Sequence, residues 1–242
     1  MCQNGWADET DTHDEYDEYK TLELGTSRSQ YSVIKKYTQA PVEYQHFKNE
    51  QLNQLTIDMA LNSFVKMAWS FMGANHPKAT TESPIADLSH ADFGTALTTK
   101  SFKTLEGYMY IGDSEDDMVQ NRQCSNFQLT INNNMENTSA LFETEAIEQS
   151  LGDFTVTGSM DVWKSGDFAR QLKNDAIDGK EKYLKVAVTR NVGTKQYAYE
   201  IHLIVHLDES SESKDGNKLK DTIKFTVGRA DGLKFIKTVK TL

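Results

Sequence analysis

The sequence SNFQLTINNNMENTSALFETEAIEQSLGDFTVTGSMDVW occupies residues 125–163 and indicates two half-buried strands. Apolar residues alternate with polar ones near each end of it, which puts an apolar and a polar row on opposite faces of an extended chain. Three asparagines end the first strand at 132–134, and Gly158 interrupts the apolar row of the second. The apolar rows are Phe127, Leu129 and Ile131, then Phe154, Val156, Met160 and Val162.

The region that follows is predicted to hold one helix and further strands. Residues 165–178 predict a helix that Ser165 can cap and Gly179 can end. Its apolar positions lie four residues apart on one face, at Phe168, Leu172 and Ala176. Strands are expected around 184–188, 197–207 and 223–227, with a polar turn at 210–217. The fold class is therefore mostly β, with one flanking α-helix at about 165–178.

The region that precedes it is also predicted to be extended. Residues 20–36 give two strand-like pieces around 25–29, and a hairpin is the natural interpretation. Residues 54–72 alternate apolar and polar side chains on both sides of Asn62 and Ser63. Helical spacing fits part of this segment too, but strict alternation with β-branched and aromatic residues favours two strands and a turn.

A long excursion is expected at about 73–100. It holds two of the three prolines and shows little periodicity, so it predicts a loop rather than a packed element. A loop of that length is usually functional, and contact with a neighbouring subunit is a plausible use. After it, residues 108–111 predict a short strand and residues 113–117 a turn.

Composition and charge are those of an ordinary folded protein. Hydrophobic residues make up 38% and charged residues 26% of the 242 residues, which argues against wholesale disorder or a fibrous chain. The net charge of -10 argues against a protein that coats nucleic acid, since such a protein shows a basic face. The length fits one large β domain or two small ones.

The acidic run at 8–18 is expected to be extended and solvated, because its charges repel one another. We therefore predict an acidic flexible segment at 1–19 and a single β-rich domain at 20–242. The spacing of Asp8, Asp11, Asp14 and Asp17 is not that of a calcium loop, and no glycine makes the sharp turn such a loop needs.

Neither a membrane span nor a secretion signal is predicted. The longest apolar run, at 201–207, is far shorter than the roughly 20 residues of a membrane helix. The N-terminus has neither the basic start nor the apolar core of a signal peptide. Folding in a reducing cytoplasm is expected, with Cys2 and Cys124 as free thiols.

No catalytic motif is found in the sequence. His202 and His206 would share one face of a helix, but in the expected strand they lie about 13 Å apart, too far to share a metal ion. Carboxylate pairs such as Glu143 and Glu145 are expected to be surface charges, and the aromatic residues are expected in the core. The sequence therefore predicts no catalytic, cofactor-binding or metal-binding residue.

Four segments carry a resemblance to a known family. They are TLELGTSRSQYSVIKKY (21–37), NQLTIDMALNSFVKMAWSFMGAN (53–75), FQLTINNNMENTSALF (127–142) and GDFTVTGSMDVW (152–163). In this order, which spans most of the chain, they resemble the tail tube proteins, or major tail proteins, of long-tailed bacteriophages with non-contractile tails.

The resemblance implies an antiparallel β-sandwich or barrel-like tail tube fold with a flanking helix. It also implies a non-enzymatic virion protein that forms hexameric rings, stacked into a tube through which double-stranded DNA passes without specific binding. The implied partners are further copies, a tape-measure protein, and tail terminator or tail tip proteins. The implied location is the virion tail after synthesis in the host cytoplasm, with no cofactor and no membrane contact.

One departure from the family accompanies this resemblance. Its members have a β-rich portion before the part that the first residues here match, so this chain is expected to begin partway through the usual domain. The missing portion is supplied differently, or the chain is a truncated product, or the register of the match is shifted. A truncated product should show an unpaired sheet edge and uncovered apolar residues.

Two other classes stay open at this point. One is a carbohydrate-binding β-sandwich module of a virion or secreted protein, whose exposed aromatic residues and acidic loops hold a sugar, with or without calcium. The other is an enzyme of an unrecognised type. In a tube, the 73–100 loop and the C-terminal strands should bury against other copies, whereas a sugar binder should keep a concave patch of Trp or Tyr open.

Overall fold

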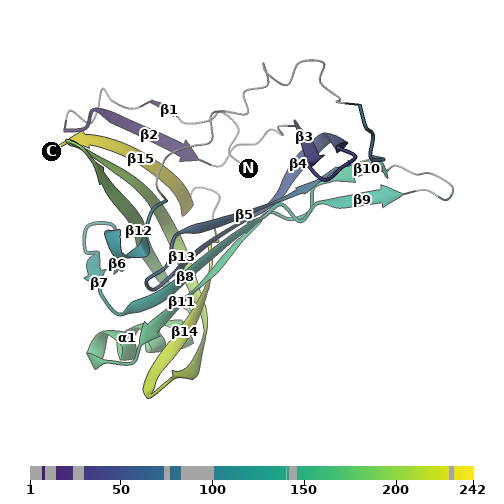
Figure 1. The fold of residues 1–242 in the computed structure, drawn as a ribbon. Helices are drawn as coiled ribbons and strands as arrows, with labels where there is room; N and C mark the ends of the chain where they lie inside the picture. Colours follow the sequence, from purple (N-terminus) through teal and green to yellow (C-terminus); the bar gives the residue numbers. More distant parts are fainter. Residues whose placement is uncertain are drawn as a thin grey trace.

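Strands dominate the computed structural model of the protein (Figure 1). The structure describes residues 7–8, 15–23, 30–73, 77–82, 101–139, 141, 146–228 and 232–242. The strands in these residues are β1 (Ala7–Asp8), β2 (Glu18–Glu23), β3 (Gln30–Tyr37), β4 (Glu43–Ala60), β5 (Lys66–Met72), β6 (Gly107–Gly112), β7 (Val119–Asn121), β8 (Cys124–Asn132), β9 (Glu136–Ser139), β10 (Ala146–Ser150), β11 (Thr155–Trp163), β12 (Glu181–Val192), β13 (Lys195–Asp215), β14 (Lys218–Thr226) and β15 (Leu233–Thr241). The helical elements are the 3-10 turn η2 (Thr104–Glu106) and the α-helix α1 (Gly166–Ile177).

Within the described residues, 13 strands form one large antiparallel sheet. Its main path runs β1-β2-β15-β13-β14-β11-β8-β4-β3. Beside this path, β12 pairs with β13 and β6, β6 pairs with β7, and β5 pairs with β4. The strands β9 and β10 form a separate hairpin. The expected mostly β fold with one α-helix is confirmed, as a sandwich-like sheet that does not close into a barrel over these residues.

Strand β13 takes part in both layers of the sandwich. Its first part pairs with β12 over Lys195–His206 and with β15 over Lys195–Leu203. From His206 onward it pairs with β14, with an irregularity between Leu207 and Glu209. Such a bulge bends a strand and increases its twist. We call β6, β12, the first part of β13, β15 and β2 the first layer, and the second part of β13, β14, β11, β8, β4 and β5 the second layer.

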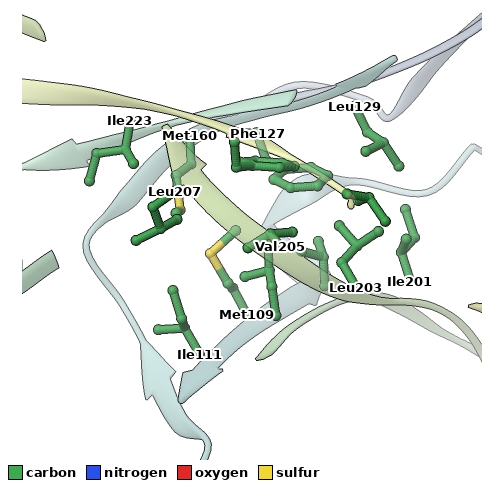
Figure 2. Packing of buried hydrophobic residues seen from close by; sticks show 14 of the residues in the cluster. Met109, Ile111, Phe127, Leu129, Met160, Ile201, Leu203, Val205, Leu207 and Ile223 are labelled. Carbon is green, nitrogen blue, oxygen red and sulfur yellow. The ribbon is translucent and has the colours of Figure 1, made fainter. Parts of the chain in front are cut away.

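The hydrophobic core lies between these layers. Figure 2 shows its side chains gathered between the ribbons, with Met109 from β6 next to Val205 from β13. From the second layer, Phe127 and Phe225 stack with ring centroids 5.9 Å apart. A Cβ atom added to Gly158 would lie 2.3 Å from Cζ of Phe225, which is why the apolar row of β11 has a gap there. Burial of this cluster supplies the main driving force for folding.

Helix α1 forms where the sequence predicts it. Leu172 and Ala176 are buried in the core, and Phe168 packs against it. Ser165 occupies the N-cap position, although its side chain makes no capping hydrogen bond. Gly179 follows the helix with a φ of 63°, a left-handed conformation that glycine adopts at little cost.

The hairpin predicted for residues 20–36 is wrong. Strand β2 pairs with β15 and β1, whereas β3 pairs with β4. Alternation identified both strands but carries no information on a partner about 200 residues away in the chain. The turn predicted at 210–217 is also too long, because β13 continues to Asp215 and only Gly216 and Asn217 make the turn.

Other predicted segments are confirmed or lie outside the described residues. The two strands at 54–72 are the end of β4 and the whole of β5, and residues 108–111 lie in β6 before a bend and turn at 113–117. Of the acidic segment 1–19, Asp8 lies in β1 and Glu18 in β2. Residues 83–100 of the expected loop are not described, while Tyr44 and Thr80 form an isolated bridge.

Candidate assembly interface

Strand β5 is an open edge of the second layer. Over Gln51–Asp58, β4 is its partner, and among the described residues nothing pairs with its other side. Its sequence, KMAWSFM, carries a single charge, at Lys66. An unpaired strand edge presents free backbone N–H and C=O groups, which makes it a template for another strand.

The side chains of β5 form an exposed apolar row that we call the β5 stripe. It consists of Met67, Trp69 and Phe71, which are 55%, 52% and 40% exposed. Across the strand pair, Met67 faces Ile57 and Trp69 faces Leu55, which are 0% and 7% exposed. Since directly paired residues share a face of the sheet, the stripe continues the core face beyond the point where the first layer covers it.

This exposure corrects the expectation that aromatic residues lie in the core. The ring of Tyr31, 43% exposed, packs edge-on against Phe71 with centroids 5.6 Å apart, so the stripe extends onto β3. Phe64, before β5, is 51% exposed. A contiguous exposed apolar patch on a folded protein marks an interaction site. Alternation in the sequence predicted an apolar and a polar face of β5, but it could not show that the apolar face is left uncovered by the first layer.

The opposite edge of the second layer is also open. There, residues 209–215 of β13 pair with β14 and, in the described part of the chain, with no other strand. Between the two edges the order is β13, β14, β11, β8, β4 and β5, and every neighbouring pair is antiparallel. With this alternation, the β5 edge runs antiparallel to the β13 edge.

The outward side of the second layer is a polar face of nearly balanced charge. One row across four strands consists only of threonines: Thr56, Thr130, Thr157 and Thr226. The Asp161 carboxylate accepts hydrogen bonds from Lys220 at 2.8 Å and Thr222 at 2.6 Å, and Lys224 pairs with Glu209 at 2.6 Å. The full polar face comprises Gln54, Thr56, Asp58, Asn126, Gln128, Thr130, Asn132, Thr155, Thr157, Ser159, Asp161, Lys220, Thr222, Lys224 and Thr226.

An arm extends from the sandwich at the N-terminal end of β4 (Figure 1). It contains β3, the first part of β4, and the β9–β10 hairpin. Amide side chains attach this hairpin to the sheet: Gln149 accepts a hydrogen bond from Gln51 at 3.2 Å and donates one to the carbonyl of Met72. Asn137 donates to the carbonyl of Gly73 at 3.0 Å. The hairpin is therefore fixed next to the end of β5.

The ionisable clusters have structural explanations. Burial acts to raise the pKa of Glu200, but hydrogen bonds from His202, Lys185 and Tyr108 lower that pKa to about 2. The Glu200 carboxylate is thus ionised near neutral pH and fully engaged, which does not suit a general base. His206 lies 3.4 Å from Glu181, so both histidines on β13 face carboxylates in their own chain.

The remaining candidates from the sequence show no reactive group either. Burial raises the pKa of the Cys124 thiol to about 12, so this free cysteine is a poor nucleophile. No cluster of three metal-binding side chains occurs among the described residues, and none of their helices has the length and apolarity to cross a bilayer. Cys2, Glu143 and Glu145 lie outside the described residues.

One family of known proteins matches most of the chain. A sequence model of the family described as phage tail tube protein matches residues 6–227. A search of curated proteins found no match.

Proposed function

The chain belongs to the phage tail tube protein family, and from this premise we propose that it forms six-membered rings, stacked into a tube that conducts DNA during infection. As a member of this family it is a structural component of the virion tail. The proposal adds the branch of long-tailed phages with non-contractile tails, and the tape-measure, terminator and tail tip proteins as partners. It requires no cofactor, metal or catalytic residue.

The single observation that carries the proposal is the uncovered β5 stripe next to an unpaired edge. Within one chain, Met67, Trp69 and Phe71 remain exposed although their cross-strand neighbours are buried. Burying an aromatic side chain removes 150–250 Å2 from water, at about 25 cal/mol per Å2. A sister copy that covers the stripe would therefore gain several kcal/mol per contact.

The two open edges of the second layer are complementary in direction. Residues 209–215 of one copy can pair with β5 of the next and continue the antiparallel order. Because the donor and acceptor edges are different surfaces, the contact is head-to-tail, and such contacts generate a ring when the rotation closes. The proposed ring thus has a continuous sheet as one of its walls.

The polar face suits the wall of a bore that DNA crosses. In a ring closed through the second layer, this face and the first layer lie on opposite sides of the sheet. Its hydroxyl and amide groups carry no charge, and Lys220 and Lys224 are already paired with carboxylates. Affinity for DNA depends on free cations that replace counterions, so such a face gives DNA little to bind.

Removing the stripe tests the proposal directly. We expect the wild-type protein to form rings or hollow tubes by negative-stain microscopy, and W69S/F71S to stay monomeric in size-exclusion chromatography. Thermal stability of the monomer should change little, because both side chains are about half exposed. The matched control is I177S/V192S, which removes two other exposed apolar side chains. A wild-type protein that stays monomeric at high concentration, or a W69S/F71S variant that assembles normally, would refute the proposal.

A further inference from the structure

A cavity opens between the two layers on the side away from the arm. It has a volume of about 250 Å3. Its apolar lining comes from both layers: Met59 of β4 and Phe127 of β8, and Met109 of β6 and Val186 of β12. At about 30 Å3 per water molecule, it has room for one large apolar side chain or about eight waters.

Polar groups of β7 and the residue after it line the same cavity. Asn121 is 7% exposed; its Oδ1 accepts a hydrogen bond from the backbone N–H of Gln123, and its Nδ2 has no hydrogen-bond partner. Leaving a buried amide donor unpaired costs about 1–3 kcal/mol, so the site favours an occupant that brings an acceptor. Arg122 is exposed, and its guanidinium contacts Gln120 but no carboxylate in the described part of the chain. The cavity therefore suits an apolar side chain accompanied by an anionic group.

The turn at residues 151–154 has this chemistry. Leu151 and Phe154 are 43% and 39% exposed, and Asp153 between them is exposed without an ion-pair partner among the described residues. Asn134 holds the turn rigidly: its carbonyl accepts from Gly152 N–H at 2.9 Å, and its side chain donates to the carbonyl of Asp153 at 2.5 Å. A preformed turn loses little conformational entropy when it binds.

The cavity and the turn lie at opposite ends of the same two strands. Cys124, where β8 begins, lines the cavity, and Trp163, where β11 ends, bonds through its backbone to Gln123 beside it. At the other end, Asn132 of β8 pairs with Thr155 of β11, directly after the turn. Nine residues of strand separate the two by about 26 Å.

We propose that the 151–154 turn of one copy docks over the inter-layer cavity of a second copy and places one apolar side chain in it, with Asp153 facing Arg122. This contact rests on the proposed tube. It lies along the strand direction rather than at the sheet edges, so it joins one ring to the next and leaves the contacts within a ring unchanged. A knob and a hole on different parts of one molecule make an open, head-to-tail series, which is the symmetry of a growing stack.

A charge exchange tests this contact. Each of R122E and D153R places like charges together, and we expect either one to raise the protein concentration needed for tubes by about tenfold. R122E/D153R restores the opposite pair and should bring that concentration back towards the wild-type value. The matched controls are R170E and D116R, which reverse exposed charges of the same types elsewhere.

The readout separates stacking from ring formation. Negative-stain microscopy and sedimentation velocity should show single rings of R122E or D153R where the wild-type protein gives tubes. L151S/F154S should give single rings too. Tubes from both single variants at the wild-type concentration, or no recovery in the double variant, would overturn the inference while leaving the ring intact. Absence of both rings and tubes for the wild-type protein would overturn the proposed function and this inference with it.

Discussion

Strand β2, which among the described residues has only the two-residue strand β1 on its outer side, and the edge strand β5 differ in the side chains they carry. Strand β2, in the first layer, is lined with charges: Glu18 pairs with Lys237 at 2.7 Å, and Glu23 lies 3.6 Å from Lys234. Strand β5, in the second layer, has the apolar stripe and only Lys66 as a charged residue. Charged residues at a sheet edge oppose further strand pairing, whereas a flat apolar edge invites it. The difference supports the proposed association through the second layer.

The largest effect on stability is expected where α1 is tied to the first layer. Asp175 is 3% exposed, and its carboxylate binds Lys180 at 2.6 Å and Lys182 at 2.7 Å. Lys182, itself 5% exposed, also contacts Asp113. Asp175→Ala would leave the buried Lys182 ammonium poorly compensated and should lower the free energy of unfolding by about 3–5 kcal/mol.

Urea unfolding followed by circular dichroism measures this loss. The matched control is Asp178→Ala, whose carboxylate is 61% exposed and should matter by no more than about 0.5 kcal/mol. Equal effects of the two variants would show that the charges of the first layer are not what holds α1 in place.

The next largest effect is a loss of stability at low pH. The pKa of Glu200 is about 2 in the folded protein, below its ordinary value of 4.5, because hydrogen bonds from His202, Lys185 and Tyr108 outweigh burial. A lowered folded-state pKa contributes stability above the unfolded pKa, and this contribution is lost as the pH falls from about 4.5 to about 2. A shift of this size corresponds to about 3 kcal/mol.

Unfolding free energies measured at pH 5 and pH 2.5 test this dependence. Glu200→Gln should flatten the curve over this range, whereas Glu148→Gln, at an exposed position, should leave its slope unchanged. A wild-type slope that survives in Glu200→Gln would assign the acid sensitivity to other carboxylates.

The smallest effect is expected at the β2 edge. Glu18 and Lys237 are 30% and 25% exposed, and partly exposed ion pairs contribute at most about 1 kcal/mol. Glu18→Gln should therefore lower the unfolding midpoint slightly and leave the protein concentration needed for assembly unchanged. If it instead promoted new aggregates, the charges on β2 would act mainly to prevent strand pairing, which would sharpen the contrast with β5.

Local sequence patterns predicted local structure well. The alternation of Phe127, Leu129 and Ile131 produced β8, and the helical spacing of Leu172 and Ala176 produced α1. Strand β15 was missed because it is buried on both faces: Ile236 and Thr238 lie on one face and Val239 on the other, so alternation disappears. The β9–β10 hairpin was missed because its residues are mostly polar, so its sequence has no apolar periodicity that would indicate a strand.

The candidate interface could not be predicted, because it depends on long-range pairing. Trp69 in the sequence is indistinguishable from a core residue of a half-buried strand. Its side chain is 52% exposed although Leu55, opposite it on β4, is buried, and alternation in the sequence cannot show that difference. Asn121 and Arg122 meet Met59 at the cavity only because β7 and β4 belong to different branches of the sheet.

The continuity of β13 through both layers has a mechanical consequence. In the proposed ring, force applied to the wall that faces the bore would pass along this one covalent strand into the other layer. Under load, such a subunit would strain as a whole, because its two layers cannot separate without breaking the strand.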